Sequence, residues 1–301
     1  LIRLKAGQSI KEVGPTWHKG KQGTPTMGGL MFIIGIGIAI LILGWKGMLE
    51  GNFTHLYVYV FALVFGVIGY IDDYQKVKHH QNTGLTAPQK FLLQLAAAVA
   101  FLCLMRYEGM LSPNLYIPFF NTHLVLPWVV YMIFAAFVII GTVNAVNITD
   151  GVDGLSASVA VVTIGTYLLA YKTELGTYAT AGVVFIGALL AYLWLNAKPS
   201  SLLMGDAGSR AMGFFIAMLS LKCGHPFAFL LAAIVFIADG SLGILKISLK
   251  RFLHIWILKN TLTPLHDHVR KRKGWSDEQV VARWLILQCV ASALLLLLVR
   301  G

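Results

Sequence analysis

Long uninterrupted apolar runs are the feature that most limits what this chain can fold into. Nine such runs follow one another along the 301 residues, and they lack the alternation that is typical of half-buried strands. A helix that crosses the hydrocarbon core needs about 20 mainly apolar residues. The runs therefore predict transmembrane helices, the shortest being the seventh. They are Met27–Trp45, Leu56–Ile71, Phe91–Met105, Leu124–Val146, Leu155–Tyr171, Tyr178–Leu195, Ala211–Leu221, Pro226–Leu245 and Trp284–Val299.

Composition supports the same fold class. Only 12% of the residues are charged, about half the share of an ordinary soluble domain, so too little charge is present to cover a soluble globule. The three cysteines lie in or beside apolar runs and are interpreted as packing residues. No internal repeat is visible. We predict an all-α, polytopic transmembrane helical bundle that forms a single domain over residues 1–301, with its active-site loops in the cytoplasm.

The net charge of +11 is distributed unevenly between the loops. Alternate segments, beginning with the N-terminal one, contain 19 of the 24 lysines and arginines. Cytoplasmic loops carry such an excess, so these segments are predicted to face the cytoplasm and the C-terminus to lie outside. The charge is thus an orientation signal, and nucleic acid is not an expected partner. The segments are Leu1–Thr26, Asp72–Lys90, Asn147–Gly154, Asn196–Arg210 and Lys246–Arg283.

Carboxylates are scarce, and their positions indicate where chemistry takes place. Nine of the 13 acidic residues fall in the predicted cytoplasmic segments, and six of these nine are candidate site residues, most of them at the edge of an apolar run. Acids at a membrane boundary are costly unless they are paired, hydrated or metal-bound. Oxygen ligands near phosphate favour Mg²⁺, so we predict a magnesium-dependent site. The six residues are Asp72, Asp73, Asp150, Asp153, Asp206 and Asp267.

Two of the acidic motifs have informative spacing. Asp72 and Asp73 end the second apolar run, and adjacent helical residues point about 100° apart. One site can therefore use both only if the helix frays there. Asp150 and Asp153 are three residues apart in a segment with two glycines, which predicts that both lie on one helical turn.

Glycine-containing segments near the acids are suited to binding phosphate groups. Asp206 lies between Gly205 and Gly208 where the next helix is expected to begin, and helix N-termini bind anions. The segment Lys19–Gly29 combines lysines, hydroxyls and glycines but lacks the spacing of a nucleotide P-loop.

The last long loop adds histidines and basic residues. His266 and His268 could bind metal, phosphate or a nucleoside, or be ordinary surface residues. Upstream, Leu249–Leu258 mixes basic and aromatic residues, which predicts a helix lying in the membrane interface. Asp239 is different because it lies within an apolar run, where an acid is either functional or hydrogen-bonded at a helix break.

Together these motifs, in this order, resemble the bacterial phospho-N-acetylmuramoyl-pentapeptide transferases, members of the polyprenyl-phosphate N-acetylhexosamine-1-phosphate transferase family. The resemblance covers essentially the whole chain. It implies ten transmembrane helices, of which the first would precede Leu1, and a multi-pass enzyme of the bacterial plasma membrane that forms homodimers. The motifs that carry it are Gly23–Gly29, Asp72–Lys76, Asn147–Gly154, Met204–Ser209, Pro264–His268 and Lys273–Trp275.

The resemblance implies a reaction and its participants. Undecaprenyl phosphate attacks the β-phosphate of UDP-N-acetylmuramoyl-pentapeptide, UMP leaves, and the first lipid-linked intermediate of peptidoglycan synthesis forms with the help of Mg²⁺. By resemblance Asp206 is the principal Mg²⁺ ligand, Asp72 deprotonates the lipid phosphate and Asp73 assists. An aspartate acting as covalent nucleophile is the alternative mechanism.

The resemblance also implies the remaining site residues. His266 is expected to be catalytic. Lys76 lies one helical turn after Asp72, and from this position it is expected to attract the lipid phosphate. Other residues are expected to line the site for the nucleotide and for nucleoside inhibitors, namely Lys21, Thr26, Asn147, Asp150, Asp153, Asn196, Asp267 and His268.

The chain departs from the family pattern at two places. Asp267 replaces the middle residue of a usual histidine triplet, and Asp239–Gly240 stands where relatives usually carry Glu-Thr. Two alternative functions share some of these features: that of a sister transferase that uses UDP-N-acetylglucosamine, and that of an ion-coupled transporter. A transporter is expected to place its acids near the bilayer midplane, whereas those of this chain lie at one predicted surface.

Overall fold

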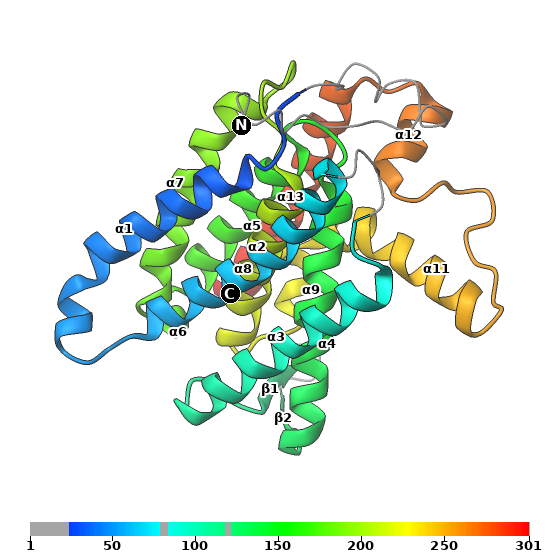
Figure 1. Cartoon of the computed structure of the whole chain (residues 1–301). Coiled ribbons are helices and arrows are strands. Elements are labelled where there is room, and N and C mark those ends of the chain that lie inside the picture. The colour runs from blue at the N-terminus through cyan, green and yellow to red at the C-terminus, as the bar shows by residue number, and fades with distance from the viewer. Residues whose placement is uncertain (1–23, 79–83, 118–121, 301) are drawn as a thin grey trace.

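The computed structural model describes residues 24–78, 84–117 and 122–300, which form a bundle of helices with one short hairpin (Figure 1). In β1 and β2 the strands pair antiparallel, Asn114 opposite Val125. The elements are α1 (Gly29–Leu49), α2 (Thr54–Lys78), α3 (Ala87–Tyr107), β1 (Asn114–Ile117), β2 (Thr122–Val125), α4 (Trp128–Thr149), α5 (Leu155–Ala170), α6 (Lys172–Leu175), α7 (Tyr178–Asn196), α8 (Gly205–Lys222), α9 (Ala228–Ala232), α10 (Ile234–Phe236), the π-helical turn η3 (Ile237–Ser241), α11 (Leu242–Phe252), α12 (Leu265–Lys273) and α13 (Asp277–Arg300).

The predicted all-α membrane bundle is confirmed, but the helices differ from the nine apolar runs in detail. Within the described residues, six helices are long and apolar enough to cross a membrane: α1, α2, α3, α4, α7 and α13. Helix α5 is apolar but shorter. The run Pro226–Leu245 is divided among α9, α10, η3 and α11.

Helix α8, which contains the shortest predicted run, lies at the centre of the bundle (Figure 1). It packs against α1, α2, α4 and α5. Every residue of Ala207–Leu221 is buried. Aromatic rings fill its surroundings, with Phe214 stacked on Phe65 at 4.9 Å between ring centroids. Because protein and not lipid surrounds α8, its sequence can be shorter and more polar than that of an outer helix.

Glycines allow α8 to approach its neighbours closely. A Cβ atom added to Gly69 of α2 would lie 2.2 Å from the carbonyl oxygen of Asp206, and one added to Gly29 of α1 would lie 2.2 Å from Cα of Gly208. Lipid tails are as apolar as the side chains, so helices in a membrane associate mainly through such close packing of small residues. The N-terminal end of α8 is thereby fixed against both α1 and α2.

The break between α9 and η3 is stabilised by a buried side chain of α13. Gln288 is fully buried; its Nε2 donates to the carbonyl oxygens of Leu231 (3.2 Å) and Ala232 (2.9 Å), and its Oε1 accepts from the Val235 N–H (3.3 Å). Broken helices persist at membrane depth only where the released backbone groups find partners. Gln288 supplies these partners.

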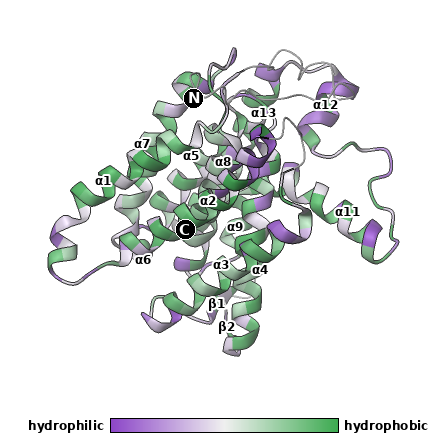
Figure 2. Ribbon diagram, viewed as in Figure 1, coloured by the Kyte–Doolittle hydropathy of each residue, from purple (hydrophilic) through white to green (hydrophobic). Residues whose placement is uncertain are grey.

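Hydrophilic residues are concentrated around α12, whereas α1 and α4 are largely hydrophobic along their length (Figure 2). The prediction of an interfacial helix over Leu249–Leu258 is wrong in its extent, because α11 ends at Phe252 and no helix continues to Leu258. His254 and Leu258 adopt positive φ angles of 55° and 49°, which a continuous α-helix excludes. The periodicity of the side chains did not reveal this backbone reversal.

Replacing Gly69 by alanine is expected to destabilise the protein by about 1–3 kcal/mol, because the added methyl group overlaps the backbone of α8. Gly35→Ala is the matched control, since a Cβ at Gly35 in α1 meets no atom within 4 Å. This control is expected to be neutral or to stabilise by up to about 1 kcal/mol. Thermal unfolding in detergent measures both, and equal stabilities would contradict the proposed packing.

Candidate functional site

Three carboxylates from two helices meet at one end of the bundle. They belong to Asp72 and Asp73 of α2 and Asp206 of α8, and one oxygen from each lies within 4.8 Å of the others. Asp72 is fully buried and Asp73 is 6% exposed. Such a set of oxygen donors could hold a metal ion.

The start of α8 positions two of these acids. The backbone N–H of Asp206 donates to Oδ2 of Asp73 at 2.7 Å, so Asp73 satisfies one of the amides that a helix N-terminus leaves free. A carboxylate at that position is also favoured by the helix dipole. Gly69, one turn before Asp73, allows this approach. The prediction that a helix begins beside Asp206 is confirmed.

The two neighbouring aspartates do not require a frayed helix, contrary to the sequence prediction, because α2 continues to Lys78. They point to different partners instead. Asp72 Oδ1 accepts from the N–H of Leu85 at 2.7 Å, and its Oδ2 lies 2.8 Å from Nζ of Lys90. Asp72 therefore faces the start of α3 while Asp73 faces α8.

Cationic side chains balance the three acids, which we call the acidic cluster. Nζ of Lys76 lies 2.7 Å from Asp72 Oδ2. The same nitrogen lies 3.3 Å from Asp73 Oδ1 and 3.2 Å from Asp206 Oδ2. Arg210, which is 2% exposed, lies 2.9 Å from Asp206 Oδ2 through its NH2 group. Buried charges persist when they are paired in this way.

Two cationic partners of the acidic cluster were not predicted from the sequence. Lys90 and Arg210 were not among the candidate residues. Arg210 had a signal, since it follows Asp206 by four residues on a helix. Lys90 had none, because only the packing of α3 on α2 brings it to Asp72.

The end of α4 and the turn after it border the acidic cluster. Nδ2 of Asn147 donates to Asp206 Oδ1 at 3.0 Å and to the Ser209 hydroxyl at 2.8 Å. The predicted helical turn through Asp150 and Asp153 is wrong, because α4 ends at Thr149 and a non-helical turn follows. The reversal ends at a glycine with φ of 80°, Gly154.

Asn196 joins this turn to the following loop. Its Oδ1 accepts from the Gly154 N–H and its Nδ2 donates to the Leu202 carbonyl oxygen, each at 2.8 Å. The residues before α1 join the same loop, since Leu203 N–H donates to the Pro25 carbonyl oxygen at 2.9 Å. Thr26 thereby lies beside Gly205, whose added Cβ would be 3.1 Å from the Thr26 hydroxyl. Lys21 lies outside the described residues.

Helix α12 presents the residues of the last loop. His266 is 2% exposed, and its Nε2 faces the turn after α4, since a Cβ on Gly151 would lie 2.5 Å from it. Asp267 approaches Arg270 with 3.5 Å between Oδ1 and NH1. His268 accepts the Leu262 N–H at 3.1 Å through Nδ1. The side chain of His266 thereby approaches the turn after α4.

An apolar groove of about 800 Å³ lies between α3, α4 and α11. Phe91, which directly follows Lys90 in α3, lines the groove. So do Asn144 and Ile148, which precede and follow Asn147 along α4. Some lining residues of the groove are therefore chain neighbours of Lys90 and Asn147, which contact Asp72 and Asp206.

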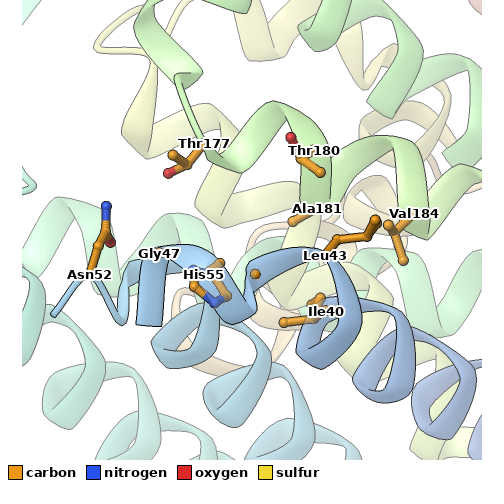
Figure 3. Close-up of a pocket in the computed structure, with 10 residues that line it drawn as sticks. Ile40, Leu43, Gly47, Asn52, His55, Thr177, Thr180, Ala181 and Val184 are labelled. Carbon is orange, nitrogen blue, oxygen red and sulfur yellow. The ribbon is translucent and has the colours of Figure 1, made fainter. Parts of the chain in front are cut away.

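A smaller pocket of about 150 Å³ lies between α1, α2 and α7 (Figure 3). His55 and Thr180 line it at the N-terminal ends of α2 and α7. Asp72 follows His55 by 17 residues of the same helix, so about 25 Å separates the two positions. This pocket is not part of the acidic cluster's site.

Comparison with known proteins identifies the family. Residues 55–224 match the family model described as glycosyl transferase family 4, and residues 21–33 match phospho-N-acetylmuramoyl-pentapeptide-transferase signature 1. A phospho-N-acetylmuramoyl-pentapeptide-transferase of Latilactobacillus sakei is 35% identical over 297 residues, which cover 98% of this chain and 90% of that protein. The enzymes of that name from Staphylococcus carnosus and Listeria innocua are each 36% identical, covering 95% and 93% of this chain and 88% and 86% of their own.

With matches that extend over nearly the full length and include the residues around the acidic cluster, the chain belongs to glycosyl transferase family 4 and, within it, to the phospho-N-acetylmuramoyl-pentapeptide transferases.

Proposed function

We propose that this protein transfers phospho-N-acetylmuramoyl-pentapeptide from its UDP conjugate to undecaprenyl phosphate, with release of UMP. The observation that carries this proposal is a charge-balanced acidic cluster whose partners Lys90 and Asn147 directly precede, along the chain, the groove-lining residues Phe91 and Ile148. A water-soluble nucleotide and a membrane-bound phosphate can meet only at such a boundary. The product is the first lipid-linked intermediate of peptidoglycan synthesis.

The lysines of the acidic cluster suit a reaction between two phosphate groups. The two substrates repel each other, and catalysis of phosphoryl transfer consists largely of positioning and charge stabilisation. Lys76 and Lys90 are held by carboxylates in the described structure. When the substrates bind, these ammonium groups turn towards phosphate oxygens and the carboxylates become free to bind a cation.

The carboxylates fit Mg²⁺, which prefers oxygen ligands and substrate phosphates. Asp206 is the principal ligand in this proposal, and Asp73 assists beside it. When bound, the ion would neutralise phosphate charge and stabilise the leaving UMP. Asp72 accepts the proton of the lipid phosphate, which then attacks the β-phosphate of the nucleotide directly.

The nucleotide enters from the aqueous side, over the turn after α4 and α12. His266 acts there as a catalytic group. The remaining side chains bind or orient the nucleotide and the inhibitors that resemble it, namely Lys21, Thr26, Asn147, Asp150, Asp153, Asn196, Asp267 and His268.

The groove takes the lipid tail of undecaprenyl phosphate, and Lys76 and Lys90 meet its headgroup. We assign the acidic cluster to the cytoplasmic side of the bacterial plasma membrane because the loops at that end carry the lysine and arginine excess. Pairing of two chains as a homodimer is part of the proposal and rests on the family resemblance.

Asp206→Asn is expected to reduce Mg²⁺-dependent UMP release by about a hundredfold or more, since loss of a ligand that stabilises transferred charge by about 3 kcal/mol has that effect. The fold should persist, because an asparagine keeps the size of the side chain. Glu50→Gln, at an exposed position at the end of α1, is the control and should retain full activity. Near-normal, magnesium-dependent turnover by Asp206→Asn would refute the assignment.

Asp72→Asn is expected to regain part of its activity, relative to the parent, as the pH rises. A phosphate monoester has a second pKa near 6, so at alkaline pH the lipid phosphate loses its proton without help from a base. Relative rates of UMP release between about pH 6 and pH 9 test this. Recovery of a phospho-sugar bound covalently to Asp72 would instead establish the two-step mechanism.

Gly141→Phe is expected to raise KM for undecaprenyl phosphate about tenfold while leaving KM for the nucleotide nearly unchanged. Gly141 lines the groove and its missing side chain faces open space, so the ring would occupy the groove with little effect on stability. Gly187→Phe, in open space on α7, is the matched control. Equal KM values for the lipid in all three proteins would exclude the groove as its binding site.

A further inference from the structure

Asp239 is a buried acid that the proposed reaction leaves without a role. It lies in η3, within the bundle, and is fully buried. Acidic residues at membrane depth are expensive and usually serve function. It does not belong to the acidic cluster, so its own contacts must explain it.

Both carboxylate oxygens of Asp239 meet the same residue of α12. Oδ1 accepts the backbone N–H of His266 at 2.7 Å. Oδ2 lies 2.7 Å from Nδ1 of the His266 ring. The N-cap residue of α12 is Pro264, which supplies no side-chain cap. Asp239 therefore provides, from another part of the chain, the oxygen that N-terminal amides of a helix require.

The backbone around Asp239 is held firmly against the bundle. A Cβ on the next residue, Gly240, would lie 2.3 Å from the carbonyl oxygen of Ala145 in α4. The helix break just before Asp239 in the chain is bound by Gln288 of α13. The carboxylate thus projects from a packed element towards α12 and contacts His266 there.

This contact also determines which ring nitrogen of His266 remains for another partner. A carboxylate accepts hydrogen bonds, so Nδ1 carries a proton and Nε2 is the nitrogen left for a ligand. Nε2 lies 3.9 Å from Oδ1 of Asp267, which is too far for a hydrogen bond. That nitrogen faces Gly151, in the turn after α4. The same turn contains Asp150 and Asp153, which the proposed function places at the nucleotide.

We infer that Asp239 is a positioning residue, which fixes the orientation and tautomer of His266 so that Nε2 acts as an acceptor at the nucleotide. The inference rests on the proposed function for the role of His266 in turnover. The arrangement of Asp239 and His266 itself does not depend on the reaction. Metal-binding and catalytic histidines commonly have their second nitrogen oriented by a carboxylate.

Asp239→Asn tests the inference with little change in volume. Both groups that face Asp239 are donors, and an amide can accept only through its single oxygen. Its oxygen would accept the backbone N–H of His266 and its NH₂ would donate to Nδ1, so the tautomer with the proton on Nε2 would be favoured. We expect kcat for UMP release to fall about a hundredfold, KM for the nucleotide to change much less, and the ¹⁵N spectrum of labelled histidine to show the tautomer of His266 reversed. The His266→Gln variant assigns its signals.

A double-mutant cycle separates positioning from stability. If Asp239 acts through His266, adding Asp239→Asn to His266→Gln should cause no further loss of kcat. Thr166→Val is the control, because it removes a buried hydrogen bond to Ser292 (2.7 Å) far from α12 along the chain. It should lower the Tm without changing kcat or the His266 tautomer.

Two results would overturn the inference: an unchanged His266 tautomer in Asp239→Asn, or losses of kcat that multiply in the double variant. If the parent protein releases no UMP, the proposed function fails. The nitrogen spectra then still decide whether Asp239 fixes the ring of His266.

Discussion

A single ammonium group held between three carboxylates is the interaction on which the site depends. Without Lys76, the like charges of Asp72, Asp73 and Asp206 would repel one another at the membrane boundary. The bonds that offset this repulsion also connect α2, α3 and α8, because Lys90 and Asp206 N–H bind the same acids. The end of the bundle is therefore stabilised by the groups that the proposed reaction uses, and substrate binding becomes an exchange of charged partners.

Helix α8, which carries Asp206, is an inner helix, and this position explains its unusual sequence. Helix α8 is surrounded by other helices and can carry Asp206 and Arg210 at its start without meeting lipid. The broken region from α9 to η3 is tolerated because Gln288 binds the released backbone groups. In the proposed reaction the lipid reaches the acidic cluster through the groove, and the nucleotide reaches it from α12.

The sequence predictions that were wrong all concern the local path of the backbone. The end of α2 does not fray, and the turn that contains Asp150 is not helical. The interfacial helix Leu249–Leu258 ends early, at Phe252. In each case the spacing of residue types was compatible with two backbone paths. Packing against another element selected one of them, as the contact of Asn196 with Gly154 illustrates.

The sequence by itself determined the membrane class, most of the long helices, the start of α8 near Asp206 and the grouping of acids in alternate loops. These properties follow from local apolar length, charge bias and glycine placement, which need no knowledge of distant contacts. Only the tertiary structure decided which groups meet. Lys76 and Asp206 are 130 residues apart, and Asp239 and His266 are 27 apart. Such pairs are set by how closely the helices pack, and packing depends on side chains of every neighbouring helix at once.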